Sequence, residues 1–328
     1  MKQMWLTGIM GLVVGDALGL PVQFSTREEM KAKPVTDMEG YGAFLVPAGS
    51  WSDDGSMALA TLCSLKEKCV VDCEDIMSRF VDWQFKGDYT PFGYAYDQGR
   101  TCLEAIYSYA KGADAYHCGQ TGERSNGNGS LMRILPVCLY GYEQVKKGAI
   151  TEEEALDMVH QVSALTHAHL RSKMACGIYY FLVKTVLNGE GSLQERLQKG
   201  MDTAKAHYEK DVANLTELAY YSRMFDLESF RQVQEDQIRS SGYVVDSLEA
   251  AVWGLLTTDN YRDAMLKVVN LGEDTDTIAA IAGGLGALYY GYEGMPAEWI
   301  EVVQKKEWIA EVCEEMEGSI IHRRALRK

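Results

Sequence analysis

The sequence NLGEDTDT at residues 270–277 leads directly into the apolar run IAAIAGGLGALYY at 278–290. Asp274, Thr275, Asp276 and Thr277 place two carboxylates and two hydroxyls in four consecutive positions. They lie where a loop meets a predicted helix over 277–292, and this helix is rich in small residues. We interpret the stretch as the junction around which the rest of the chain is organised, with a polar site at the start of a helix.

A second acidic cluster, Ser52, Asp53 and Asp54, lies more than two hundred residues earlier, also just before a helical pattern. Serine and aspartate are good helix caps, worth about 1 kcal/mol each, and this explains each residue alone. Alternatively, folding brings the two clusters together as oxygen ligands for Mg²⁺, Mn²⁺ or Ca²⁺. The recurrence of the cluster slightly favours a metal site, in which four aspartates hold two ions about 4 Å apart.

Histidine and cysteine patterns predict neither a zinc site nor a disulfide framework. His167 and His169 are two positions apart, so a helix would point them to different faces, and we expect them to pack or to form hydrogen bonds. The eight cysteines are scattered singly and form no Cys-x-x-Cys pair. Reduced, packed thiols are the simpler interpretation, and they predict a cytoplasmic location.

Charge and composition restrict the classes of partner. The 328 residues carry a formal net charge of −15, with an isoelectric point near 4.9. This disfavours binding to duplex nucleic acid, which needs a basic surface, and to anionic membranes. The apolar run over 278–292 is shorter than the ~20 residues that span a bilayer. The apolar start, residues 4–19, lacks a basic leader and a small-residue cleavage pattern, so we predict a first core helix there.

The hydrophobic periodicity predicts one all-α domain over residues 1–328, in which 188–245 is a more charged and more variable helical excursion. Four glycines in the first helix would permit another backbone or a ligand to approach closely. Its single charge, Asp16, either bonds nearby helix-end amides or belongs to the site. Residues 20–51 are predicted to be a loop. Helices are predicted over 4–19, 53–66, 72–85, 100–112, 152–165, 170–187, 193–208, 212–225, 246–257, 259–269, 277–292, 297–304 and 307–317.

Two loops offer further candidates for binding. Gly127, Asn128, Gly129 and Ser130 precede an apolar run, and such a loop can cradle an anion or form an ordinary capped turn. Arg133 is equally consistent with a salt bridge and with a phosphate contact. The aromatic residues of 92–96 could stack on a base or pack their own loop, and packing is the favoured interpretation.

Taken together, the motifs resemble the ADP-ribosylglycohydrolase family, which includes dinitrogenase reductase-activating glycohydrolases and J1-type crystallins. The resemblance rests on six stretches in order, 11–19 (GLVVGDALG), 51–57 (WSDDGSM), 97–101 (DQGRT), 127–133 (GNGSLMR), 166–167 (TH) and 272–283 (GEDTDTIAAIAG). It implies a compact all-α fold with a binuclear Mg²⁺ site, Mn²⁺ being an alternative, in a cleft. It also implies hydrolysis of the bond that joins ADP-ribose to a small molecule, a protein or a nucleic-acid end.

The resemblance also assigns residues to roles. The metal ligands would be Ser52, Asp53, Asp54, Asp274, Asp276 and Thr277. Gly127, Asn128, Gly129 and Ser130 would cradle the diphosphate, and Asp97 would lie near the ribose. Asp53, Asp54, Asp97 and Gln23 are the candidate catalytic residues.

Gln23 departs from the family pattern, in which many members have glutamate. An amide cannot accept a proton at neutral pH. Three outcomes remain open: Asp54, Asp97 or a metal-bound water takes the role, Glu28 or Glu29 serves instead, or the chain is a weak hydrolase or an ADP-ribose-binding protein.

Overall fold

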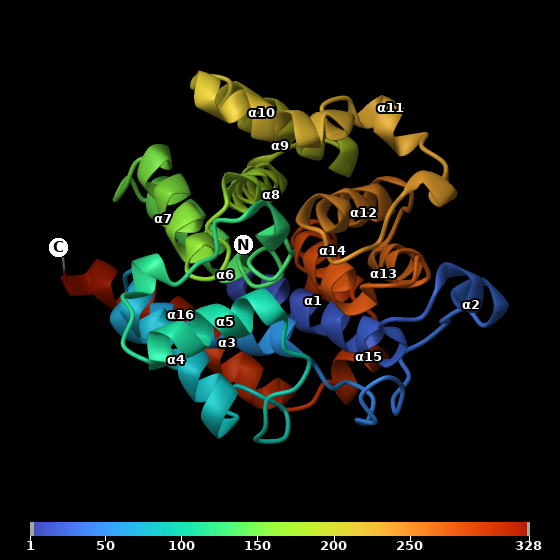
Figure 1. Cartoon of the computed structure of the whole chain (residues 1–328), viewed down its shortest axis with the longest axis horizontal. Helices are drawn as coiled ribbons and strands as arrows, with labels where there is room; N and C mark the ends of the chain where they lie inside the picture. Colours follow the sequence, from blue (N-terminus) through green and yellow to red (C-terminus); the bar gives the residue numbers. More distant parts are fainter. Residues whose placement is uncertain (1–2, 327–328) are drawn as a thin grey trace.

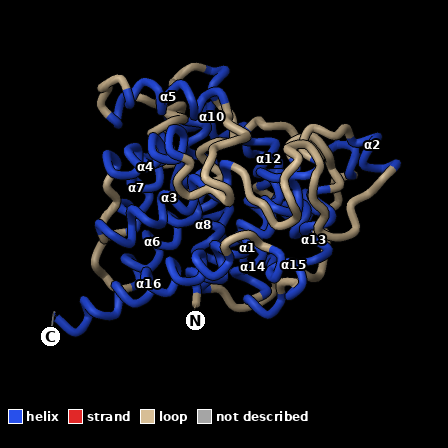
Figure 2. Tube along the Cα trace, turned by 90° about the horizontal axis from the view of Figure 1, so that it is seen from below, coloured by secondary structure: helices blue, strands red, loops and turns tan. Residues whose placement is uncertain are grey.

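A computed structural model describes residues 3–326. In that range the chain forms α-helices, loops and short 3₁₀ turns, and it contains no β-strand (Figure 1; Figure 2). The all-α prediction is therefore confirmed. The helices are α1 (Met4–Gly19), α2 (Arg27–Ala32), α3 (Asp53–Lys68), α4 (Cys73–Lys86), α5 (Arg100–Ala110), α6 (Leu135–Lys146), α7 (Glu152–Ala164), α8 (Leu170–Asn188), α9 (Leu193–Tyr208), α10 (Leu215–Leu218), α11 (Leu227–Arg231), α12 (Val244–Leu256), α13 (Tyr261–Val269), α14 (Thr275–Tyr290), α15 (Ala297–Val302) and α16 (Lys306–Leu326).

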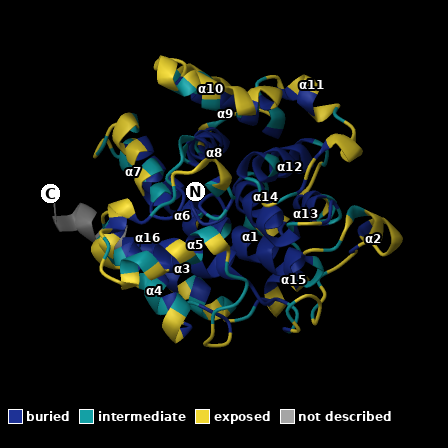
Figure 3. Ribbon diagram, viewed as in Figure 1, coloured by how far each residue is buried: buried dark blue, intermediate teal, exposed yellow. Residues whose placement is uncertain are grey.

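Helices α1 and α14 pack against each other at the centre of the molecule, and both are buried along almost their whole length (Figure 3). Their small residues allow the two backbones to touch. A Cβ atom on Gly15 would lie 2.0 Å from the Ala279 carbonyl oxygen, and one on Gly19 would lie 2.4 Å from the Asp276 amide nitrogen. The glycines of α1 thus allow the close approach of another backbone. Gly19 lies against the first turn of α14.

The remaining helices surround this pair in layers. Helices α3, α4, α5 and α16 lie on one side, and α6, α7 and α8 lie on another (Figure 1). Helix α9 and the short α10 and α11 form an outer layer that packs on α8 and α12. This layer coincides with the charged segment 188–245, whose status as a variable excursion stays a prediction.

Some elements differ from the sequence-based boundaries. Helix α2 lies inside the predicted loop 20–51, and the prediction contained neither α6 nor α11. The predicted helix over 212–225 is broken into the 3₁₀ turn Val212–Asn214, the single turn α10 and the 3₁₀ turn Ala219–Met224. Apart from α6, these elements carry too few residues for a 3.6-residue period to show in the sequence.

The amino-terminal segment is built into the core. Met4–Val22 is long and apolar enough to cross a membrane by length and composition, but 83% of its most apolar window is buried inside the protein. This is the packing that a core helix requires. All eight cysteines are free, and all of them except Cys69 are buried.

Candidate active site

The two acidic clusters meet where α3 and α14 begin. The Thr277 hydroxyl, on α14, donates to Asp54 Oδ2, on α3, at 3.3 Å. The Ser52 hydroxyl donates to the same oxygen at 3.0 Å. Residues more than two hundred positions apart therefore share one hydrogen-bonded group. Ser52 also caps α3, by accepting from the Asp54 amide, so capping and site formation coexist there.

Asp16 holds the start of α3 in place from the neighbouring helix α1. Its carboxylate accepts hydrogen bonds from the backbone amides of Ser52, at 2.9 and 3.0 Å, and Gly55, at 2.8 Å. Burial raises its pKa to about 7, although these amide bonds act in the opposite direction. Asp16 therefore bonds helix-end amides, as one of the two interpretations predicted, and by doing so it positions the acidic cluster.

Six carboxylates crowd this junction: Asp16, Asp53, Asp54, Asp97, Asp274 and Asp276. Burial is the main cause that raises the pKa of each. For Asp53, Asp54 and Asp276 the charges of neighbouring carboxylates raise the pKa further. None of the six forms an ion pair with a lysine, arginine or histidine in the described part of the chain. The buried carboxylates therefore lack the positive charge that would compensate them.

Unpartnered oxygens show that this donor set fits hard cations. Asp54 Oδ1, Asp276 Oδ2 and Gln23 Oε1 are buried and have no hydrogen-bond partner. Carboxylate, amide and hydroxyl oxygens are the ligands that Mg²⁺ and Ca²⁺ prefer, whereas zinc prefers histidine and cysteine. The six predicted ligands Ser52, Asp53, Asp54, Asp274, Asp276 and Thr277 therefore form a chemically suitable group.

A cavity of about 330 Å³ opens directly above the acidic junction. Its size lies at the lower end of the range of small-molecule sites, which begins near 300 Å³. Its wall includes Asp53, Asp97, Asp274, Thr277 and Gln23, whereas Asp54 and Asp276 are buried beneath it. The cavity thus places an organic ligand next to the carboxylates.

The Gly127–Asn128–Gly129 loop forms another wall of this cavity. The Asn128 amide donates to the Gly242 carbonyl at 3.0 Å, so the loop is paired with a segment that precedes α12. The Asn128 side chain donates to Asp274 Oδ2 at 2.6 Å and to the Ser247 hydroxyl at 2.9 Å. One residue therefore ties the predicted diphosphate loop to the predicted metal ligands.

Ser130 and Arg133 point away from the cavity. The Ser130 hydroxyl is buried against Ser163 and Cys176, and it does not belong to the cavity wall. Its predicted role in ligand binding therefore depends on the backbone. Arg133 does not line the cavity, and it forms no salt bridge in the described part of the chain. It is fully buried, donates to Thr166 and packs over the Phe80 ring.

Gln23 lies at the cavity, within hydrogen-bonding reach of Asp97 and Asp274, and it lowers the pKa of both carboxylates against the larger effect of burial. Glu28 and Glu29 do not take its place. Both are exposed on α2, and Glu29 forms a capping box with Thr26. The amide at position 23 is therefore the group that faces the site.

Several residues line the cavity although the sequence predicts no site role for them. His167 packs against the glycine loop, and its Nδ1 shares a hydrogen bond with Thr166 at 2.8 Å. Burial lowers its pKa to about 3, so the ring is neutral. Gly242 and Phe24 also line the cavity. The Thr-His pair signalled His167, whereas Gly242 lies in a segment that carried no recognisable motif.

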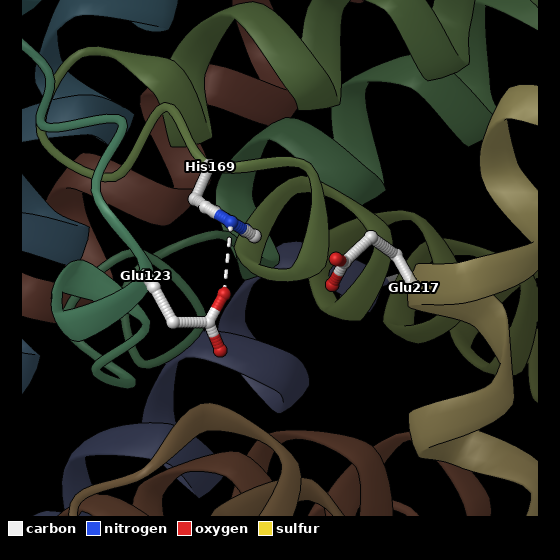
Figure 4. Close-up of side chains that lie close together, drawn as sticks. All are labelled: Glu123, His169 and Glu217. Carbon is white, nitrogen blue, oxygen red and sulfur yellow. Dashed lines mark ion pairs between the residues drawn. The ribbon is translucent and has the colours of Figure 1, made fainter.

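A separate polar cluster, Glu123, His169 and Glu217, brings candidate metal-binding atoms within 4.8 Å of one another (Figure 4). Arg171 bridges its two carboxylates, because its guanidinium donates to Glu123 at 2.7 Å and to Glu217 at 2.8 Å. We interpret the cluster as an ion-pair network that joins the outer helical layer to the loop before Gly127.

Comparisons with known proteins identify the family of the chain. The family model described as ADP-ribosylglycohydrolase matches residues 5–326. The ADP-ribosyl-dinitrogen reductase glycohydrolase of Rhodospirillum rubrum is 30% identical over 310 residues, covering 92% of this chain and 90% of that protein. The ADP-ribosylarginine hydrolase Tri1 of Serratia proteamaculans is 28% identical over 308 residues, covering 94% of this chain and 77% of that protein.

A solved structure agrees at the level of the fold. An "ADP-ribosylglycohydrolase-related protein complex" matches with a TM-score of 0.76 and 27% sequence identity, covering 96% of each chain. Motifs, fold and matched length all lead to the same result. The chain belongs to the ADP-ribosylglycohydrolase family of glycosidic-bond hydrolases.

Proposed function

We propose that this protein is a Mg²⁺-dependent hydrolase that cleaves the glycosidic bond between ADP-ribose and an acceptor. One observation carries the proposal: a cavity lies between the glycine loop and a buried group of carboxylates that has no cationic partner in the described chain. The acceptor is a protein, a small molecule or a nucleic-acid end. Arginine-linked ADP-ribose is the first substrate to test, because relatives bear the name ADP-ribosylarginine hydrolase.

Ser52, Asp53, Asp54, Asp274, Asp276 and Thr277 would hold two Mg²⁺ ions, or Mn²⁺ in their place. When bound, the ions supply positive charge that neutralises the carboxylates and favours ionisation of water near pH 7. The free oxygens of Asp54 and Asp276 are available as ligands without the loss of any hydrogen bond.

The chain's own residues would bind and orient the substrate. Gly127 and Gly129 let the backbone approach a diphosphate closely, and the pairing of Asn128 with Gly242 fixes the loop. Cleavage passes through an oxocarbenium-like state at the ribose, which nearby negative charge stabilises. Asp97 lies on the cavity wall, and its left-handed backbone, with φ of 55°, is a conformation that aspartate tolerates. We propose that the Asp97 side chain lies near the ribose of the substrate.

A substrate panel tests the proposal. The protein would be incubated with ADP-ribosylated arginine, serine and nucleic-acid ends, first with Mg²⁺ and then with EDTA. We expect release of ADP-ribose from at least one substrate, and loss of that release with EDTA. Failure to release ADP-ribose from any of them would contradict the proposed activity.

Gln23 supports a second candidate function, an ADP-ribose-binding protein with weak or no hydrolase activity. The amide at the cavity cannot exchange a proton as a carboxylate would. Calorimetry with ADP-ribose separates the two functions, since binding without turnover on the panel favours the second. The eight free cysteines agree with the cytoplasmic location that we propose for either function.

A further inference from the structure

Large apolar side chains are exposed beside the mouth of the cavity. Phe24, which lines the cavity, is 70% exposed, and Tyr41 and Leu45 are 70% and 77% exposed. These side chains and their aromatic neighbours form a surface that we call the aromatic rim. It consists of Phe24, Tyr41, Phe44, Leu45, Phe92, Tyr94 and Tyr96. Exposed apolar side chains that gather at a functional site favour binding of a partner.

Five of the six aromatic rings of the rim form a continuous row of contacts, and Tyr41 is outside this row. Phe24 and Phe44 have ring centroids 6.2 Å apart, and Phe44 and Tyr96 are 5.8 Å apart. Tyr96 continues to Tyr94 at 5.8 Å, and Tyr94 continues to Phe92 at 6.2 Å. The Tyr96 hydroxyl donates to the Trp51 carbonyl, which anchors the row next to α3. Five rings thus lead from the cavity outward, although packing of their own loop was the favoured prediction for three of them.

The backbone of the rim is held in an unfavourable conformation. Phe24, Tyr41 and Leu45 have φ angles of 70°, 61° and 55°, in the left-handed region that large side chains rarely adopt. Hydrogen bonds hold them there: the Phe24 amide donates to the Glu273 carbonyl at 2.7 Å, and the Tyr41 amide donates to the Val46 carbonyl at 2.6 Å. Glycine would fit these positions better. Strain retained at a site is a reason to look for function.

The two loops that carry most of the rim contain acidic residues and no basic ones. Residues 37–46 and 87–97 contain Asp37, Glu39, Asp88 and Asp97, and they contain no lysine, arginine or histidine. Basic side chains from other segments lie nearby: Arg262 pairs with Asp37, Lys305 donates to the Thr90 carbonyl, and Arg100 lines the cavity. Exposed aromatic rings attract cations through their faces, and the carboxylates add to this attraction. A basic, partly apolar partner fits this surface, whereas a nucleic-acid end would be repelled.

We propose that the aromatic rim binds a basic polypeptide segment that flanks the ADP-ribosylated side chain. This inference rests on the proposed function, because the ADP-ribosyl group occupies the cavity while its carrier lies on the rim. The consequence is a preference for ADP-ribosylated protein over the same linkage on a free amino acid.

The test compares two substrates on the Mg²⁺-loaded protein: ADP-ribosylarginine, and a lysine- and arginine-rich peptide ADP-ribosylated on one arginine. The variant Tyr41→Gly/Leu45→Gly removes apolar surface and suits the positive φ angles, so its fold is expected to be retained. Val212→Ala, at a residue that is 79% exposed in the 3₁₀ turn Val212–Asn214, is the matched control.

We expect the double variant to raise the KM for the peptide about tenfold, with kcat and the kinetics of ADP-ribosylarginine unchanged. The control variant should change neither. Equal KM values for the variant and the unmodified protein on the peptide would overturn the inference, and so would an equal rise for both substrates. A peptide with acidic flanks that is cleaved as well as the basic one would also overturn it.

Binding keeps the inference separate from the proposed function. If the unmodified protein cleaves neither of these substrates and none of the substrate panel, the proposed function fails. The fluorescence anisotropy of the labelled, unmodified basic peptide then decides about the rim. Binding that the double variant weakens about tenfold supports the rim, whereas absence of binding to the unmodified protein overturns it.

Discussion

Gln23 places an amide between two carboxylates, Asp97 and Asp274, at the wall of the cavity. If this amide limits hydrolysis, Gln23→Glu restores a group that exchanges protons. We expect the release of ADP-ribose from the best substrate of the panel to accelerate about 10²-fold, which is the usual contribution of a positioned acid or base. Steady-state kinetics with Mg²⁺ measures this. Gln23→Met keeps the side-chain length but has no group that exchanges protons, so it should give no gain in rate.

The outcome also distinguishes the two candidate functions. An unchanged or slower rate in Gln23→Glu would contradict the idea that the amide limits catalysis, and another residue would then carry the proton. A faster rate in Gln23→Glu would show that the unmodified protein is a weak hydrolase because residue 23 carries an amide in place of a carboxylate.

Asp276 carries the clearest prediction for the metal site. Its Oδ2 is buried without a partner, and burial together with the charges of four neighbouring aspartates raises its pKa. Asp276→Asn removes one like charge while Asn Oδ1 can still accept from the Thr277 amide, as Asp276 does at 2.9 Å. In EDTA at pH 8 we therefore expect the variant to be more stable than the unmodified protein, by about 1–2 kcal/mol.

Mg²⁺ should reverse this order. Ligand at a hundred times its Kd stabilises the unmodified protein by about 2.7 kcal/mol, and the variant should lose most of that gain. Thermal unfolding with and without Mg²⁺ measures both effects. Asp88→Asn, at an exposed carboxylate, is the control. A variant that is less stable in EDTA and equally stabilised by Mg²⁺ would exclude Asp276 as a ligand.

At the scale of elements, the sequence predicted α1, α3 and α14 because each carries a long apolar pattern, which in α3 and α14 begins beside an acidic cluster. It missed α2 and α6 for identifiable reasons. Helix α2 has only six residues, although Thr26 and Glu29 spell a capping box. Helix α6 begins at Leu135-Pro136, and the proline reads as a break although it occupies the first turn.

The candidate site also contains residues that the sequence predicts and residues that it does not. The carboxylates and the glycine loop were predictable, because motifs with hard oxygen donors and free backbone carry their chemistry in the sequence. Gly242 and Phe24 were not, since they reach the cavity only through the pairing of Gly242 with Asn128 and of Phe24 with Glu273. Such contacts are tertiary, and no local pattern records them.

The packing of α1 on α14 gives a prediction with a matched control in the same helix. A Cβ atom on Gly15 would lie 2.0 Å from the backbone oxygen of Ala279, whereas one on Gly8 would meet only side-chain ends, the nearest at 3.2 Å. Gly15→Ala should therefore lower the free energy of unfolding by about 3 kcal/mol or more, despite its better helix propensity. Gly8→Ala should change it by less than about 1 kcal/mol. Urea denaturation of both variants measures the difference, and equal effects would contradict the close backbone contact.

For the whole molecule, the acidic residues fall into two groups, one on the surface and one buried at the candidate site. The net charge of −15 belongs partly to the surface, where it is expected to disfavour duplex nucleic acid, and partly to carboxylates buried at the start of α3 and α14. Folding must bury these groups before a cation compensates them. The free energy for this comes from the surrounding apolar helices, in which α1 and α14 are almost completely buried. Burial of these carboxylates thus lowers the stability of the folded protein, and bound cations are expected to restore that stability.

The pH dependence of folding can be tested outside the acidic site, at His160. Its Nε2 lies 2.7 Å from the Tyr208 hydroxyl, and burial lowers its pKa to about 3. The unfolded chain, with a pKa near 6.5, binds a proton that the native state rejects, so stability falls as the pH drops below 6.5. His160→Gln lacks this proton and can keep a hydrogen bond to Tyr208. The variant should be less stable at pH 7.5, and its deficit should shrink by about 1.4 kcal/mol per pH unit between pH 6 and 4. Urea denaturation across that range measures the deficit, with exposed His117→Gln as the control. A deficit that stays constant with pH would mean that the native state protonates His160 as readily as the unfolded chain does.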